Sequence, residues 1–129
     1  MQPKTPKLLR DIRDAARFIL DATRGKTLAA YRAERMLRNA VERNFEIVGE
    51  AIKRLASLDA GTAARIGDYP RIIAFRNVLI HGYDLVDQGR IWDLVQNQLG
   101  PLVVTLRKAL RSGPFGVQAN LFDDPGSDS

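Results

Sequence analysis

The sequence predicts an all-α antiparallel bundle of four or five helices. In the long stretches of the chain, apolar residues recur at the i, i+3, i+4, i+7 spacing of a helix. No stretch alternates apolar and polar residues as a half-buried strand does. Glycine and proline mostly separate the periodic stretches, which places the turns between helices. With 129 residues, the chain fits a single domain with one core.

The N-terminal half predicts two helices. Apolar positions between Lys7 and Thr23 keep the helical period, and Gly25 follows as a stop signal. A short separate turn at 28–31 then precedes the longest predicted helix, which runs to about residue 58. Gly49 lies inside this helix, where glycine costs about 1 kcal/mol relative to alanine. We therefore expect a close helix approach or a ligand contact at Gly49.

The third predicted helix is short and follows a long connection. Residues 58–70 are rich in turn-forming residues and are predicted to be that connection. Pro70 opens a helix that runs to about Leu79, because its fixed φ and missing N–H are harmless in a first turn.

The last predicted helix follows a second loop. Asp87 is placed to cap it, and its apolar series runs to about Arg111. Pro101 should kink or divide this helix near Gly100. The predicted domain therefore covers residues 1–111. The remainder, 112–129, mixes glycine, proline and acidic residues without a period and is expected to be a flexible acidic tail.

Charge is distributed unevenly between the predicted domain and the tail. Residues 1–111 hold all 20 lysines and arginines against 12 acidic residues, a net charge of +8. The tail carries three aspartates and no basic residue. A basic domain attracts polyanions, so RNA, DNA, nucleotides or an acidic protein are the candidate partners.

Composition limits the remaining classes of function. The chain has no cysteine and one histidine, which excludes a disulfide framework and leaves no thiolate metal site. Metal catalysis is not expected, although the carboxylates leave a bound magnesium ion as an alternative. No cofactor is predicted. No apolar run approaches the roughly 18 residues that a membrane span needs. We expect a cytoplasmic protein.

The single histidine lies in the segment RNVLIHGYD, residues 76–84. Arg76 and His81 would point about 140° apart on a continuous helix. Gly82 can end the helix, so that His81 and Tyr83 turn back toward Arg76 and Asn77 and share one polar corner. The alternative is structural: a histidine at a helix C-terminus is often only a favourable partner of the helix dipole.

This segment resembles the signature of the HepT-like ribonucleases, the toxin half of prokaryotic HEPN/MNT toxin–antitoxin pairs. The pattern is arginine, four residues, histidine, one residue and tyrosine, with asparagine after the arginine. Residues 41–55 and 91–102 resemble the long and the last helix of that family. The resemblance covers about residues 7–110. It departs at 68–73, DYPRII, which lacks the tryptophan often found after the proline in the family.

The resemblance implies a HEPN-fold endoribonuclease that acts on RNA (mRNA or tRNA) without a metal ion and forms a homodimer. His81 would be the base and Arg76 the cation that stabilises phosphoryl charge, with Asn77 in support. One chain has one histidine, so a second His81 across a two-fold axis would complete an acid–base pair. The resemblance further implies that a nucleotidyltransferase antitoxin transfers AMP to Tyr83.

Two further readings stay open in the sequence. Glu50 either pairs with Arg54 on the helix surface or supports the site by orienting Arg76 or His81. We expect Trp92 to lie in the core or at an interface rather than to stack on a base. As a whole, the chain could also be a noncatalytic HEPN module that binds a nucleotide or serves as partner subunit of a nucleotidyltransferase.

Overall fold

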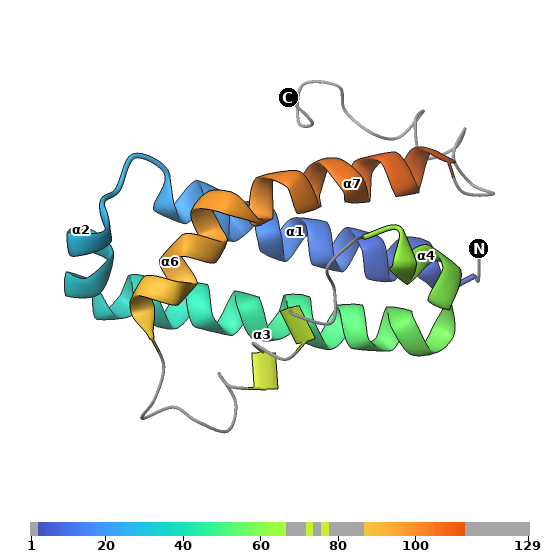
Figure 1. Cartoon of the computed structure of the whole chain (residues 1–129), viewed down its shortest axis with the longest axis horizontal. Helices are drawn as coiled ribbons and strands as arrows, with labels where there is room; N and C mark the ends of the chain where they lie inside the picture. Colours follow the sequence, from blue (N-terminus) through green and yellow to red (C-terminus); the bar gives the residue numbers. More distant parts are fainter. Residues whose placement is uncertain (1–2, 67–71, 74–75, 78–86, 113–129) are drawn as a thin grey trace.

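A computed structural model of the chain describes residues 3–66, 72–73, 76–77 and 87–112. These residues form helices and contain no strand, which confirms the predicted all-α class (Figure 1). The helices are α1 (Thr5–Thr23), α2 (Leu28–Ala33), α3 (Arg35–Leu58), α4 (Ala60–Ala64), α6 (Gln88–Asn97) and α7 (Leu99–Ser112).

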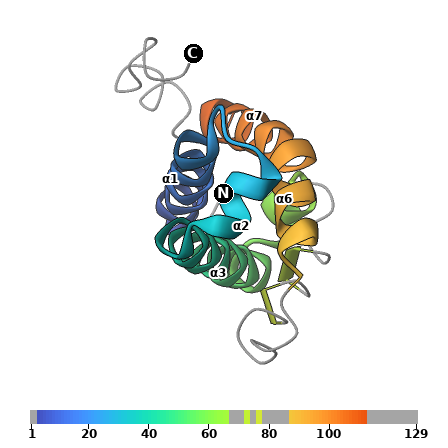
Figure 2. The same ribbon diagram turned by 90° about the vertical axis from the view of Figure 1, so that its left-hand side faces the viewer.

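Helix α1 lies between α3 and α7 and runs antiparallel to both (Figures 1 and 2). Helix α6 crosses from the first part of α3 to α7, and α4 covers the C-terminal end of α3 (Figure 1). The apolar faces of these helices meet in one core. Its fully buried side chains include Leu9, Ile12, Ile19, Val41, Val48, Ile52, Leu55, Ile91 and Leu106. Burial of each such side chain contributes about 1.5–3 kcal/mol to folding.

The chain reverses between α1 and α3 through α2, a helix of six residues where the sequence predicted a turn at 28–31. Gly25 has φ 74°, and the Thr27 side chain accepts a hydrogen bond from the Ala30 N–H at 3.1 Å, which caps α2. Tyr31 of α2 is fully buried against Trp92 of α6, with 5.3 Å between ring centroids. Trp92 is partly buried and packs against the core.

The predicted connection at 58–70 was wrong in one part, because residues 60–64 form α4. Asp59 stabilises this helix: its side chain accepts a hydrogen bond from the Thr62 N–H at 3.1 Å. The same carboxylate accepts from the Thr5 hydroxyl at 3.0 Å. Thr62 and Ala63 are buried, so the short helix is fixed by tertiary contacts rather than by its own propensity.

The division of the last predicted helix is confirmed. The Asp87 side chain accepts hydrogen bonds from the N–H groups of Gly89 and Arg90, at 2.9 and 3.2 Å, and caps α6. Helix α6 ends at Asn97, and α7 begins at Leu99 with Pro101 in its first turn. Proline fits there because first-turn N–H groups have no intrahelical acceptor. Within the described residues, no helix combines the length and apolar character needed to cross a bilayer.

Candidate active site

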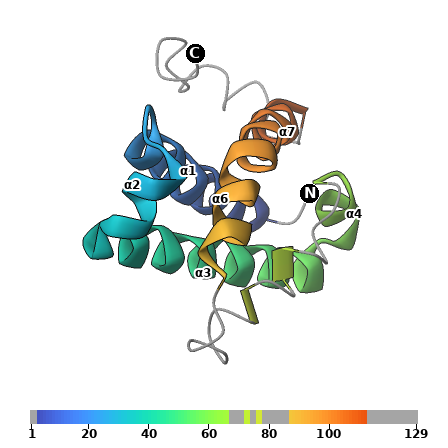
Figure 3. The ribbon, with the colours of Figure 1, turned by 60° about the vertical axis from the view of Figure 1, so that its left-hand side comes forward.

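Arg76 lies directly on α3, at Gly49. Between positions 67 and 86 the structure describes Ile72, Ile73, Arg76 and Asn77, all helical and placed beside α3 (Figure 3). The two isoleucines pack against the core. A Cβ atom placed on Gly49 would lie 2.4 Å from Cβ and 2.6 Å from Cγ of Arg76. Only glycine leaves room for this approach. The close approach expected at Gly49 is thus the contact of Arg76 with α3.

Two oxygens hold the Arg76 guanidinium. Nη2 donates to Oε2 of Glu50 at 2.7 Å, and Nη1 donates to Oδ1 of Asn77 at 2.9 Å. The arginine side chain is 18% exposed, and its Nε is buried without an acceptor among the described residues. Charge-assisted bonds of this length fix both the position and the plane of the guanidinium. Among the described residues, the second N–H of each Nη atom has no acceptor and can bind an anion.

Glu50 connects two arginines. Its second oxygen, Oε1, accepts from Nε of Arg54 at 3.2 Å, one helical turn further along α3. The two readings of Glu50 from the sequence, surface pairing and orientation of Arg76, therefore coexist. Within this cluster of three side chains, one carboxylate between two guanidinium groups leaves a net charge of +1 beside Arg76.

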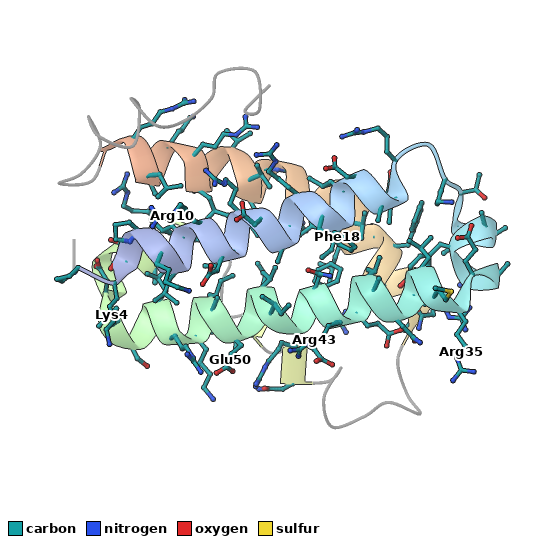
Figure 4. All side chains as sticks on the ribbon, turned by 180° about the vertical axis from the view of Figure 1, so that it is seen from behind. Lys4, Arg10, Phe18, Arg35, Arg43 and Glu50 are labelled. Carbon is teal, nitrogen blue, oxygen red and sulfur yellow. The ribbon has the colours of Figure 1, made fainter. Side chains whose placement is uncertain are left out.

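Arg76 opens onto a groove between α1 and α3. A cavity of about 590 Å³ is lined there by Leu8, Asp11, Asp14, Ala15, Phe18, Arg43, Asn44, Glu46, Ile47, Glu50, Ala51, Arg54 and Arg76. Figure 4 shows Phe18 of α1 facing α3, with Arg43 and Glu50 along α3. The sequence did not predict this groove. Phe18 lies beside the apolar stripe of α1, and a single helix does not reveal which flank a neighbour leaves open.

His81 and Tyr83 lie outside the residues that the structure describes, so the predicted polar corner is described only for Arg76 and Asn77. On either side of positions 78–86, a described residue contacts α3. Before them, Arg76 contacts Gly49 and Glu50. After them, Nε2 of Gln88 donates to Oε2 of Glu42 at 3.4 Å. The anchoring positions 42 and 49 are about two helical turns apart, on the same flank of α3.

Comparison with known proteins adds an independent result. A sequence profile of the family described as Ribonuclease HepT-like matches residues 12–109. A candidate RNase of Methanocaldococcus jannaschii is 30% identical over 96 residues, which cover 70% of this chain and 74% of that protein. A candidate RNase of Caldanaerobacter subterraneus subsp. tengcongensis is 26% identical over 109 residues, or 84% of this chain and 96% of that protein. No solved structure matches the chain.

Proposed function

Because the chain belongs to the HepT-like ribonuclease family, we propose that it is the toxin of a HEPN/MNT toxin–antitoxin system, an endoribonuclease that cleaves mRNA or tRNA in the cytoplasm without a metal ion. The observation that carries this proposal is the fixed guanidinium of Arg76, held by Glu50 and Asn77 at the rim of a groove. It lies five residues before the single histidine of the chain. A cation can stabilise the charge on the phosphoryl oxygens and an imidazole can transfer the proton when a phosphodiester is cleaved.

The proposed reaction is an attack of the ribose 2′-OH on the adjacent phosphate. His81 takes the 2′-OH proton as the new P–O bond forms. The bond from phosphorus to the 5′-oxygen breaks, and that oxygen receives a proton from a general acid. Arg76 stabilises the charge on the phosphoryl oxygens. The products are a 2′,3′-cyclic phosphate and a 5′-hydroxyl.

A homodimer supplies the general acid. Each chain contains one histidine, so base and acid cannot both be imidazoles of the same chain. We propose that two chains pair about a two-fold axis, with one His81 acting as base and the other as acid. The net charge of +8 on residues 1–111 holds the RNA backbone with little sequence preference.

A cleavage assay with the purified protein tests the proposed function. Labelled single-stranded RNA is incubated with the protein in excess chelator, and the product ends are identified by mass spectrometry. We expect fragments that end in 2′,3′-cyclic phosphate. The alternative is a noncatalytic module that binds a nucleotide or a nucleotidyltransferase. Intact RNA together with nucleotide binding in a calorimeter would support that alternative.

Tyr83 is the proposed site of inactivation by AMP transfer from a partner nucleotidyltransferase. The added phosphate, seven residues after Arg76, would pair with the cation and repel the substrate backbone. After incubation with the nucleotidyltransferase encoded next to the gene and with ATP, the intact mass should rise by whole AMP units and RNA cleavage should stop. The variant Tyr83→Phe should keep its mass and its cleavage. A Tyr83→Phe protein that still gains AMP would refute the assignment, and Tyr69→Phe is the matched control.

A further inference from the structure

The cavity beside Arg76 has an exposed aromatic side chain in its lining. Phe18 of α1 is 48% exposed and lines the cavity of about 590 Å³ together with Arg76. Because Thr5 pairs with Asp59 and the two helices are antiparallel, Phe18 lies beside about position 46 of α3. Figure 4 shows its side chain facing α3. Phe18 is therefore about one helical turn along α3 from Glu50, which holds the Arg76 guanidinium.

Apolar side chains line the same cavity next to Phe18. Ala15 and Ala51 are buried, and Ile47 is partly buried and packs against the core. A nucleobase has two apolar faces and a polar edge, and its stacking on an aromatic side chain is a common way of binding single-stranded RNA. The apolar part of the cavity therefore fits the face of a base.

Asn44 supplies a fixed hydrogen-bond acceptor in the cavity. Its Nδ2 donates to the carbonyl oxygen of Ala40 at 2.8 Å, so a contact within α3 orients the amide. Among the described residues, no group donates to Oδ1 of Asn44, which remains as an acceptor. Each of the four RNA bases carries an N–H donor on its Watson–Crick edge. A base stacked on Phe18 can donate to Oδ1 whatever its identity.

Charged side chains form the rest of the lining, and every carboxylate among them has a cation partner. The centre of a protein–protein contact is poor in charged residues, because burial removes their hydration. A stacked base leaves its ribose and phosphate in water, so it covers the apolar residues without desolvating the ion pairs. The lining therefore favours a nucleotide over a second protein chain. The ion pairs are Glu50 with Arg76 and Arg54, Glu46 with Arg43, Asp11 with Lys7, and Asp14 with Arg13.

We propose that this cavity is a base-binding subsite, in which Phe18 stacks on an RNA base and Asn44 accepts a hydrogen bond from its edge. The inference rests on the proposed function, in which Arg76 binds the phosphate that is cleaved. A phosphate at Arg76 places the adjoining nucleotide near Phe18, so its base can enter the cavity. A base inside a duplex is already stacked and paired, and it cannot enter. The substrate is therefore single-stranded RNA or the loop of a folded RNA.

Two labelled probes of equal length and charge test the stacking directly. One is a 2′-O-methyl oligoadenylate, which lacks the attacking hydroxyl. The other carries tetrahydrofuran spacers in place of the nucleosides and has no base. In fluorescence anisotropy, Phe18→Ala should weaken binding of the oligoadenylate about 10-fold and leave binding of the spacer strand unchanged. Phe18→Trp should restore binding of the oligoadenylate. Phe18→Leu, which is apolar but has no aromatic face, should not.

The matched control is Val104→Ala. Val104 of α7 is 47% exposed, close to the value for Phe18, and does not line the cavity. This variant should bind both probes as the wild type does. Light scattering after size exclusion should give one mass for wild type and Phe18→Ala. A lower mass for Phe18→Ala would identify the groove as a contact between chains and overturn the proposal. Unchanged binding of the oligoadenylate by Phe18→Ala would also overturn it.

Cleavage of labelled RNA separates the subsite from the ribonuclease. Phe18→Ala should raise KM for single-stranded RNA about 10-fold and change kcat less than about twofold, because stacking is equal in the bound substrate and the transition state. A wild type that binds oligoadenylate through Phe18 and cleaves no RNA would refute the ribonuclease and leave the subsite. Cleavage by Phe18→Ala with an unchanged KM would refute the subsite and leave the ribonuclease.

Discussion

The variants Arg76→Ala and His81→Ala are each expected to lower the initial rate of RNA cleavage at least about 100-fold, the cost of one oriented charge-stabilising donor or general base. The variant Arg76→Lys should lower the initial rate of RNA cleavage by nearly as much. A lysine ammonium is a point charge and cannot reproduce the planar fork that contacts Glu50 and Asn77 together. Rates with labelled RNA, and growth arrest on expression, measure the effect.

The control for these variants is Arg24→Ala. Arg24 is exposed and pairs with Asp21 at 2.7 Å, at the end of α1, so its removal changes the net charge without touching the groove. It should cleave RNA at the wild-type rate. Equal cleavage and equal growth arrest by wild type, Arg76→Ala and His81→Ala would favour the noncatalytic binding module.

The variant Gly49→Ala is expected to lower the free energy of unfolding by about 1–3 kcal/mol. An alanine inside an exposed helix normally stabilises it by about 1 kcal/mol over glycine. At Gly49 the new methyl group would fall 2.4 Å from Cβ of Arg76, so the segment that carries Arg76 has to move. A displacement on the order of 1 Å is enough to lower a catalytic rate about 100-fold. Urea unfolding and RNA cleavage report the two effects.

Gly61→Ala is the matched control. Gly61 also lies in a helix, α4, and a Cβ atom there would meet nothing closer than Oδ1 of Asp59, at 3.9 Å. This variant should be as stable as the wild type or more so, with unchanged cleavage. If Gly49→Ala behaved in the same way, the contact with Arg76 would not be what requires glycine at position 49.

Local sequence patterns predicted the parts of the fold that depend on local interactions. Residues close together in the sequence determine the helical periods of α1 and α3, the cap at Asp87 and the division before Pro101. Helix α4 was missed because its stability comes from burial and from the contact of Asp59 with Thr5, 54 residues away. No local pattern contains such a contact.

The candidate site likewise has features that a local sequence pattern predicts and contacts between distant residues that it does not. The motif from Arg76 to Tyr83 predicts the reactive residues, and the glycine in mid-helix predicts a close contact at position 49. The partner in that contact is not readable from the sequence, because Glu50 and Arg76 are 26 residues apart. The groove lies where the other helices leave one flank of α1 and α3 uncovered. That arrangement follows from the packing of all the helices and not from the pattern of any one of them.

Helix α3 sets the distance between the two anchors of the segment that holds His81. The separation of positions 42 and 49 follows from helical rise and is independent of the number of residues between Asn77 and Asp87. One residue inserted into α3 between the anchors would rotate one against the other by about 100°. One residue inserted between Asn77 and Asp87 leaves the two positions on α3 unchanged. Differences in length among homologous chains should therefore collect between Asn77 and Asp87 and be absent from this stretch of α3.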